Sequence, residues 1–355
     1  THVHPTGNFL KPAFSRFFNK DLIAFLNGEG LTTVLERGKR YFPASGNSAD
    51  VLDSIMKWVK AQGADFHYNE PVEHLLVNGD VVRGVKTSKS EYSADKVILA
   101  TGGKSYPATG SSGDGYKIAM QAGHTLIHPR PALVPLETRD KIPSEINDLI
   151  LKNVRIAVWI DGRKSGDTFG EIGFHSRGLT GPGILTVSRD VVSALDQGSE
   201  VQISLDLKPA LDDQQFDKRL LRELNKAGNK SVIHLFRSLL PSSVIPYVMK
   251  RTNVDRSLRC DQLTAKKRKR IRREIKNMVF NINGYRPFKE AIITAGGIPT
   301  KEITAKTMES KIVNGLFFAG EILDLDGDTG GYNLQIAFST GWLAGQSAVS
   351  VLSKA

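Results

Sequence analysis

The spacing of apolar residues changes from a helical period to a strand period within the first 130 residues. Apolar side chains recur at helical spacing over residues 9–36 and from Asp50 to Gln62, where Gly63 follows as a C-cap. Asn78-Gly79-Asp80 predicts a hairpin turn, and a further helix is expected from Asp114 to Gly123. Short apolar or alternating runs predict strands at 67–68, 72–77, 81–85 and 96–99.

The rest of the chain changes pattern several times. The patterns predict strands and turns over 129–208, helices over 212–281, strands at 291–294 and 315–319, and a helix over 332–352. This order predicts an α/β framework that is interrupted by a β-rich and helical excursion. The expected divisions are a first α/β part (1–128), a β-rich domain (129–208), a helical subdomain (209–282), a return through the β-rich domain (283–300) and a last α/β part (301–355).

The segment from Gly315 to Gln335 carries the strongest chemical signal. An apolar strand ends in Gly320-Glu321, where the glycine lets a ligand approach and the carboxylate can accept hydrogen bonds from sugar hydroxyls. Gly330-Gly331 then opens an apolar helix, whose free N–H groups suit a phosphate group or the pyrimidine edge of a flavin. A strand–turn–helix unit without a ligand is the alternative interpretation.

A second apolar strand also ends in glycine. Val97–Leu99 leads into Ala100-Thr101-Gly102-Gly103, as expected where a dinucleotide crosses the strand ends of an open sheet. Lys104-Ser105 gives this segment some likeness to a P-loop. Ile98 stands where the first P-loop glycine is required, so we reject an NTPase.

Several segments together resemble one family. They are ATGGKSYPATGSSGDGY, PALVPL, GEIGF with GLTGPGIL, TAGGIPTKEI, and GLFFAGEILDLDGDTGGYNLQIAFSTGWLAG. These segments are similar to the aminoacetone-oxidase-like flavoproteins of the BaiN type, which are often described as NAD(FAD)-utilising dehydrogenases. The resemblance runs nearly from end to end.

This resemblance implies an α/β fold and a flavin cofactor. The expected fold is a glutathione-reductase-like, Rossmann-type FAD-binding domain that lacks its first βαβ unit and carries an inserted β-barrel-like domain and a helical subdomain. The residues that match the family's FAD contacts are Val72, Ala100, Thr101, Gly102, Gly103, Gly320, Glu321, Asp324, Gly330, Gly331, Tyr332, Asn333, Leu334 and Gln335.

Two departures from the family pattern change what is expected. The family begins with a strand, a GxGxxG turn and a Gly-rich loop, which this sequence does not contain. We therefore expect a longer gene product with these elements before Thr1, and weak FAD binding by the present chain alone. Phe174-His175-Ser176 stands where the family has Phe-Thr-His, so the role of that histidine does not transfer directly.

No catalytic residue follows from these patterns, because a flavin itself carries the electrons. Tyr106 and Tyr332 are candidates to face the flavin. His175 is a candidate proton donor or substrate contact, and a structural histidine in a barrel loop is the alternative.

The charge of the chain is concentrated in one helix. Lys266–Lys276 contains eight Lys/Arg and one Glu, on a chain whose net charge is +11. A solvated helix face is one interpretation, and binding of RNA phosphates is the other. Some members of the resembling group are linked to reduction of uridine in ribosomal RNA. The candidate RNA contacts are Lys267, Arg268, Lys269, Arg270, Arg272 and Arg273.

The leading prediction is a cytoplasmic FAD-dependent oxidoreductase that acts on a small-molecule substrate, with NAD(P)H as a candidate electron donor. The alternatives are an RNA-modifying reductase acting on structured RNA through the helix at 264–280, and a non-catalytic scaffold. A single cysteine, Cys260, excludes an internal disulfide, and no Cys/His cluster has metal-ligand spacing. No apolar run approaches the roughly 20 residues that cross a bilayer.

Overall fold

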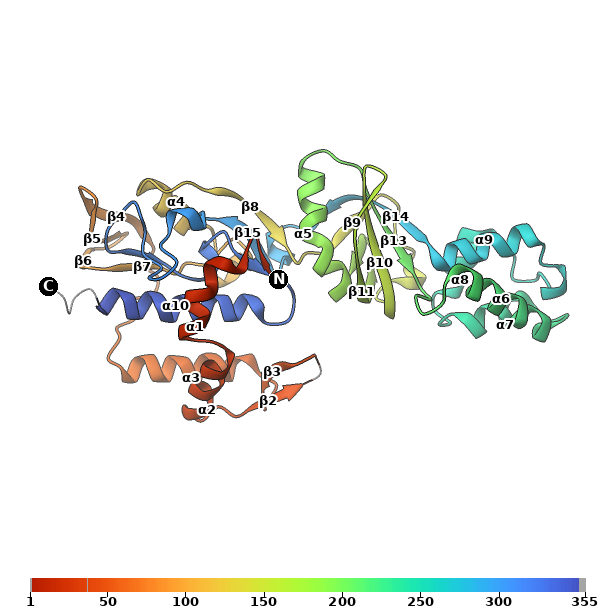
Figure 1. Ribbon diagram of the computed structural model, residues 1–355, viewed down its shortest axis with the longest axis horizontal. Coiled ribbons are helices and arrows are strands. Elements are labelled where there is room, and N and C mark those ends of the chain that lie inside the picture. Colours follow the sequence, from red (N-terminus) through yellow and green to blue (C-terminus); the bar gives the residue numbers. More distant parts are fainter. Residues whose placement is uncertain (1, 37, 351–355) are drawn as a thin grey trace. The chain divides into compact units, whose positions relative to one another are not determined.

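The computed structural model describes residues 2–36 and 38–350, and the chain divides into two compact units (Figure 1). Unit 1 consists of Thr1–Arg130 and Ile293–Ala355, and unit 2 consists of Pro131–Ile292. Each unit has its own hydrophobic core. The expected return segment 283–300 is therefore divided, because residues 283–292 belong to unit 2 and residues 293–300 belong to unit 1.

Two short parallel strands lie side by side in unit 1. They are β7 (Val97–Leu99) and β16 (Leu316–Phe318), and all three residues of β16 are buried. The helix α10 (Tyr332–Ser350) contacts both strands. Residues 351–352 of the predicted helix lie outside the described residues. The helix carries Ala344 and Ala348 in the core, and such small side chains allow close packing of a helix on strands.

Unit 1 also contains other helices and several separate sheets. Its remaining helices are α1 (Lys11–Arg16), α2 (Asn19–Gly28), α3 (Ser48–Ala61) and α4 (Asp114–Gln121). Its other sheets are β1 (Val3–His4) with β17 (Asp326–Gly327), β2 (Thr33–Glu36) with β3 (Arg40–Pro43), β4 (Val72–Asn78) with β5 (Val81–Thr87) and β6 (Glu91–Ser93), and β8 (Ile127–Ala132) with β15 (Ile293–Gly297).

The structure corrects two predictions for unit 1. The helical prediction over 9–36 is wrong at its end, because β2 pairs antiparallel with β3 and so takes the extended conformation. The strand predicted at 67–68 is not formed, and β6 was not predicted. Among the described helices of the whole chain, none combines the length and apolar content that a bilayer crossing requires.

Six antiparallel strands of unit 2 close into a barrel in the order β10-β11-β12-β9-β14-β13. The strands are β9 (Leu136–Thr138), β10 (Ile150–Ile160), β11 (Arg163–His175), β12 (Gly178–Thr180), β13 (Val201–Asp206) and β14 (Met278–Tyr285). Ile156 and Val158 of β10 alternate with more exposed neighbours and fill the core, as does Ile203 of β13. The predicted barrel-like insertion is confirmed.

The pattern over 129–208 predicts strands only, and the helix α5 (Pro182–Asp196) contradicts it. Proline at the first helical position suits a helix start. The first N–H groups of a helix have no acceptor within the helix, and proline has no N–H group that would need one. Ile184, Val187 and Val191 recur at helical spacing on the buried face. These β-branched side chains favour strands in isolation, which hides the helix from sequence inspection.

Four helices follow β13 before the chain returns to the barrel. They are α6 (Asp213–Ala227), α7 (Val232–Leu239), α8 (Ile245–Thr252) and α9 (Ala265–Lys276). Their apolar faces join the barrel residues in one continuous core. The predicted helical segment, to 282, extends too far, because Met278 and Val279 pair with Leu205 and Ser204 of β13 and so begin β14.

A buried histidine follows α4 in unit 1. The His124 side chain is fully buried, with Nδ1 3.0 Å from Glu302 Oε2 and Nε2 2.9 Å from Ser310 Oγ. Ser310 Oγ already accepts the N–H groups of Ile312 and Val313, so its own proton points to Nε2. The hydrogen bonds therefore select the neutral imidazole with its proton on Nδ1. Burial lowers the pKa of His124, although Glu302 opposes this shift.

We expect His124 to make the protein less stable as the pH falls below about 6.5, the usual histidine pKa. Since the folded-state pKa is lowered, the unfolded chain binds more protons than the folded protein in this range. Proton binding therefore favours the unfolded chain as the pH falls, and the free energy of unfolding decreases. Urea unfolding at pH 7.5, 6.5 and 5.5 measures the effect. His124→Gln is expected to lower stability at pH 7.5 and to reduce the further loss towards pH 5.5; parallel pH profiles would contradict this assignment.

Candidate cofactor site

The parallel pairing of β7 and β16 brings the two glycine motifs together. Because the strands run in the same direction, their carboxyl ends lie at the same edge of the sheet. The Ala319 N–H donates to the Leu99 carbonyl at 3.0 Å, directly before both motifs begin. Ala100–Gly103 and Gly320-Glu321 are therefore neighbours, although more than 200 residues separate them in the sequence.

A hydrogen-bond network fixes the Glu321 carboxylate. Oε1 accepts from the Ser105 hydroxyl and from the Thr294 N–H, each at 2.8 Å. The Thr294 hydroxyl oxygen accepts the N–H groups of Lys104 and Ser105 at 2.8 and 3.1 Å. The second carboxylate oxygen, Oε2, has no hydrogen-bond partner within the described residues. One oxygen thus orients the side chain and the other remains able to accept a ligand hydroxyl.

Three residues of this region were not predicted from the sequence. Ser105 and Thr294 position Glu321, and the buried Tyr116 hydroxyl donates to the Glu321 carbonyl at 3.4 Å. Ser105 and Tyr116 belong to the ATGGKSYPATGSSGDGY segment, so that segment was itself the available signal. Thr294 opens TAGGIPTKEI, but its role depends on contacts with residues about 190 positions away.

Three features of this region are compatible with a bound dinucleotide. A Cβ atom at Gly103 would clash with Thr294 Oγ1 and lie 2.6 Å from Glu321 Oε1, so only glycine fits beside this network. The Thr101 Oγ1 atom is buried and has no hydrogen-bond partner in the described part of the chain. A Cβ at Gly115 would clash with that oxygen. An orphaned hydroxyl, an available carboxylate oxygen and a glycine-lined approach fit FAD.

The helix α10 packs directly on this region. The Gly320 N–H donates to the buried Thr340 Oγ1 at 2.9 Å, which joins the β16 end to the helix. Gly330 and Gly331 have φ angles of 125° and 93° before the first turn. The Asn333 side chain is used internally, because it accepts from the Gly327 N–H and donates to the Gly327 carbonyl. Gln335 likewise donates to Ser339 Oγ at 2.9 Å.

Asp324 and Tyr116 lie in a desolvated environment. Burial raises the pKa of Asp324, and Arg130 opposes this shift. Burial and the negative charges of Glu321 and Asp324 raise the pKa of Tyr116. The Tyr116 phenol therefore stays protonated at neutral pH and keeps the proton that it donates to the Glu321 carbonyl.

The remaining predicted residues lie at other positions. Val72 begins β4, which belongs to a separate three-stranded sheet of unit 1. Tyr106 precedes a short 3-10 turn with φ 51° and is 51% exposed. Tyr332 stacks on His2 at 4.6 Å between ring centroids, and Leu334 is exposed.

His175 ends β11 in unit 2. Its Nδ1 accepts the Arg177 N–H at 3.2 Å, which places the ring proton on Nε2. Nε2 is buried without a hydrogen-bond partner among the described residues. Burial, followed by the nearby Arg286, lowers the pKa of His175. The neutral ring therefore presents an unused N–H donor.

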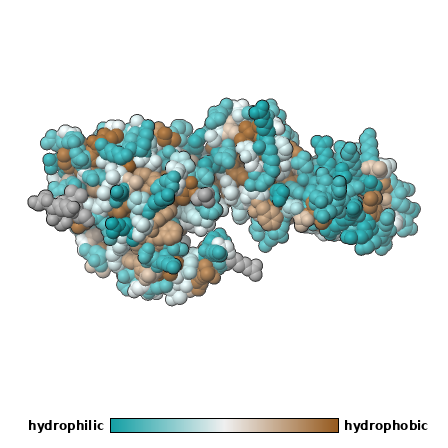
Figure 2. Space-filling view, viewed as in Figure 1, coloured by the Kyte–Doolittle hydropathy of each residue, from teal (hydrophilic) through white to brown (hydrophobic). Residues whose placement is uncertain are grey.

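The six predicted RNA-contacting residues of α9 divide between two faces. Arg268 and Arg272 lie 3.5 and 3.6 Å from Asp217 of α6, and Lys267 is half-buried. The exposed face instead carries Lys269, Arg270 and Arg273, joined by Lys266 one turn earlier. Hydrophilic residues cover the surface over α6–α9 in Figure 2. The six candidate RNA contacts therefore do not share one exposed face.

Comparison with known proteins gives matches along nearly the whole chain. A family model described as HI0933-like protein Rossmann domain matches residues 1–347. The chain is 29% identical to a 3-dehydro-bile acid delta(4,6)-reductase of Clostridium scindens, over 96% of this chain and 82% of that protein. It is 29% and 28% identical to ribosomal RNA dihydrouridine synthases of Haemophilus influenzae and Escherichia coli, over 96% and 99% of this chain and 82% and 84% of those proteins.

Two solved structures are also similar. Mycobacterium smegmatis Sdh1 in complex with UQ1 has a TM-score of 0.40 and 17% identity, over 94% of this chain and 54% of the other. The E. coli quinol fumarate reductase subunit FrdA, as a mutant, has a TM-score of 0.42 and 14% identity, over 98% of this chain and 60% of the other. The chain thus spans little more than half the length of these two proteins.

The family match and the reductase relative confirm the prediction of an FAD-dependent oxidoreductase with a Rossmann-type domain. They support the broad family, whereas the aminoacetone-oxidase-like subtype and NAD(P)H as electron donor stay predictions.

Proposed function

This chain belongs to the HI0933-like family, and we propose that within this family it reduces a carbon–carbon double bond conjugated to a carbonyl group of a small molecule. The names of its relatives describe reactions at this type of double bond. A delta(4,6)-reductase of a 3-dehydro acid acts on double bonds next to a ketone. Dihydrouridine differs from uridine by saturation of the ring double bond next to a carbonyl.

The Glu321 network is the observation that carries the proposal. Glu321 Oε2 would accept a hydrogen bond from a hydroxyl group of the flavin side chain. Thr101 Oγ1 would gain the hydrogen-bond partner that it lacks. Ser105 and Thr294 would keep Glu321 oriented. FAD, when bound, supplies the hydride for the double bond. Tyr106, next to Ser105 and 51% exposed, is the candidate to donate the proton.

Anaerobic reoxidation of the reduced flavoprotein tests this function. Flavin is reduced by dithionite, and reoxidation is followed by absorbance after addition of an α,β-unsaturated ketone or its saturated analogue. We expect rapid reoxidation by the unsaturated compound alone. Equal rates with both ketones, or no reoxidation by a panel of cyclic enones, would argue against double-bond reduction. The same assay, started with NADH or NADPH, identifies the electron donor.

Structured RNA is a second candidate substrate, and the exposed face of α9 favours it. Lys266, Lys269, Arg270 and Arg273 form no ion pair within the described residues. Such a row of unpaired cations gains free energy by releasing counterions from RNA phosphates. The two ribosomal RNA dihydrouridine synthases among the relatives point in the same direction.

A salt titration of RNA binding tests this candidate. We expect a variant with the four exposed residues of α9 changed to Gln to show a weaker salt dependence of RNA binding. The slope of the logarithm of the binding constant against the logarithm of the salt concentration should fall by up to about 3–4, because each duplex phosphate contact contributes about 0.9. The matched control changes Lys11, Lys20, Lys57 and Lys60 of unit 1, which removes the same charge from another surface. Equal slopes for both variants would contradict RNA binding by α9.

A further inference from the structure

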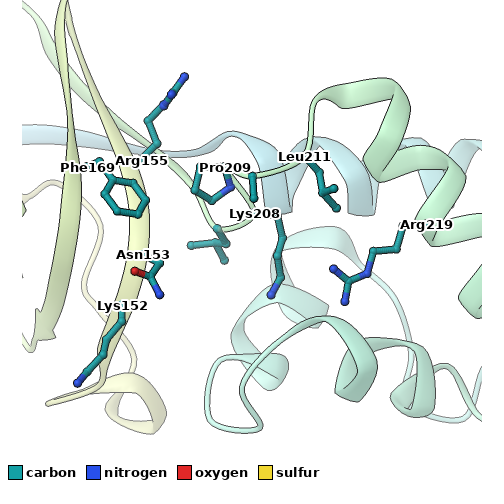
Figure 3. Close-up of a pocket in the computed structure, with 10 residues that line it drawn as sticks. Lys152, Asn153, Arg155, Phe169, Lys208, Pro209, Leu211 and Arg219 are labelled. Carbon is teal, nitrogen blue, oxygen red and sulfur yellow. The ribbon is translucent and has the colours of Figure 1, made fainter.

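We propose that unit 2 contains a binding pocket for a free nucleotide, with phosphate groups on Lys208 and Arg219 and the base on Phe169. The cavity has a volume of about 540 Å³, which is within the range of small-molecule sites. One wall is formed by β10 and β11, and the other by the loop after β13 together with α6 (Figure 3). This proposal does not depend on the double-bond reduction proposed above.

The cationic side of the pocket lacks its own counter-charge. Lys208 and Arg219 extend side by side in Figure 3, and their ammonium and guanidinium groups form no ion pair within the described residues. Arg219 Nε is buried without a hydrogen-bond partner in the described part of the chain, and Nη2 donates to the Ser238 carbonyl at 3.4 Å. Burial and the charge of Arg219 lower the pKa of Lys208. Two desolvated like charges favour an anion between them.

The acidic residues of the elements that form the pocket have other partners. Asp206 accepts from Lys276 Nζ at 2.6 Å. Glu171 lies 3.8 Å from Lys152, another lining residue, at the exposed rim of the barrel wall. Asp217 of α6 faces Arg268 and Arg272. An external anion can therefore bind without competition from these carboxylates.

The opposite wall offers a surface for a planar ring. Phe169 of β11 is 61% exposed although it lines the pocket, and Leu207 and Pro209 of the loop after β13 add apolar surface from the other wall. Exposed aromatic faces next to cations stack on nucleobases. Asn153 has φ 59° at an irregularity in the β10–β11 pairing, which presents its amide on the same wall. The pocket thus offers cations for phosphate groups, an aromatic ring for stacking and an amide for hydrogen bonds. This combination matches a nucleotide better than a simple inorganic anion.

The loop that carries Lys208 is fixed before any ligand binds. Lys276 Nζ donates to Asp206, to the Lys208 carbonyl and to the Leu211 carbonyl. The Lys208 N–H donates to Asp206 Oδ1 at 2.8 Å. A fixed backbone reduces the conformational entropy that binding would otherwise remove.

Calorimetric titration of the protein with ADP, at saturating FAD, tests the pocket. Saturating FAD occupies the cofactor site, so ADP binding there does not interfere. We expect K208Q and R219Q to weaken ADP binding about tenfold or more. F169A is expected to weaken ADP binding but to leave pyrophosphate binding nearly unchanged. The control K218Q removes an exposed charge from the same helix, outside the pocket lining, and should have little effect.

Four results would overturn the proposal. ADP could fail to bind, or could bind equally to wild type, K208Q and R219Q. Pyrophosphate could bind as tightly as ADP with no effect of F169A, which would make the pocket a simple anion site. A short single-stranded RNA could bind in a Lys208-dependent manner while ADP does not, which would assign the pocket to a nucleic-acid chain. Unfolding curves of each variant show whether any loss of binding reflects loss of folding.

Discussion

Replacement of Glu321 by glutamine is expected to weaken FAD binding by about 10–100-fold, the range for loss of a hydrogen bond to a charged group. The glutamine side chain can still accept from Ser105 and Thr294 through its carbonyl oxygen, so the network that orients the side chain is preserved. The amide nitrogen must then occupy the place of Oε2. A donor replaces the acceptor that a flavin hydroxyl requires. Fluorescence titration of the apoprotein with FAD measures the change.

Ser105→Ala is the matched comparison for this experiment. It removes one donor to Oε1 and leaves Oε2 in place, so a smaller loss of FAD affinity is expected. Thermal unfolding of both variants without FAD shows whether the fold is retained. If E321Q binds FAD as tightly as wild type, Glu321 orients the strand ends without contacting the cofactor.

The second large effect is expected at Lys276. Its side chain is 11% exposed and its ammonium group contacts Asp206 and two backbone carbonyls. Lys276→Met keeps most of the apolar stem but leaves the half-buried Asp206 carboxylate without its cation. We expect the free energy of unfolding to fall by about 2–3 kcal/mol, at the lower end for such pairs because water still reaches them.

Urea unfolding at pH 7 measures this loss, with Lys266→Met as control. Lys266 belongs to the same helix and the same basic run, but it is exposed, so its replacement should change stability by less than about 0.5 kcal/mol. Equal stability of the two variants would mean that Lys276 is only a solvated member of the basic run.

The sequence predicted the parts of the cofactor site that depend on local pattern. An apolar strand followed by glycine signals a strand end open to a ligand, so Gly103 and Gly320 could be found without a structure. Thr294 could not, because it contacts Ser105 across 189 positions. The same limit applies to β14, since only its pairing with β13 shows that Met278 has left the helix.

Charge was the property that the sequence predicted least completely. The run 266–276 shows a basic helix, but not that Arg268 and Arg272 face Asp217 or that Lys276 fixes a loop. Each of these roles depends on a residue from another element. α5 was hidden for a different reason, because its β-branched side chains favour extended structure until tertiary packing decides.

The pairing of Leu205 with Met278 places both ends of the four-helix excursion next to each other. In terms of connectivity, α6–α9 is an enlarged loop of a β-hairpin. The entropy of closing such a loop grows only slowly with its length, so the excursion can lengthen, shorten or be exchanged while the strand register of the barrel stays unchanged. Because these helices share one core with the barrel residues, a shortened version of unit 2 with a β-turn between residues 205 and 278 would also need polar replacements where the helices now cover the barrel.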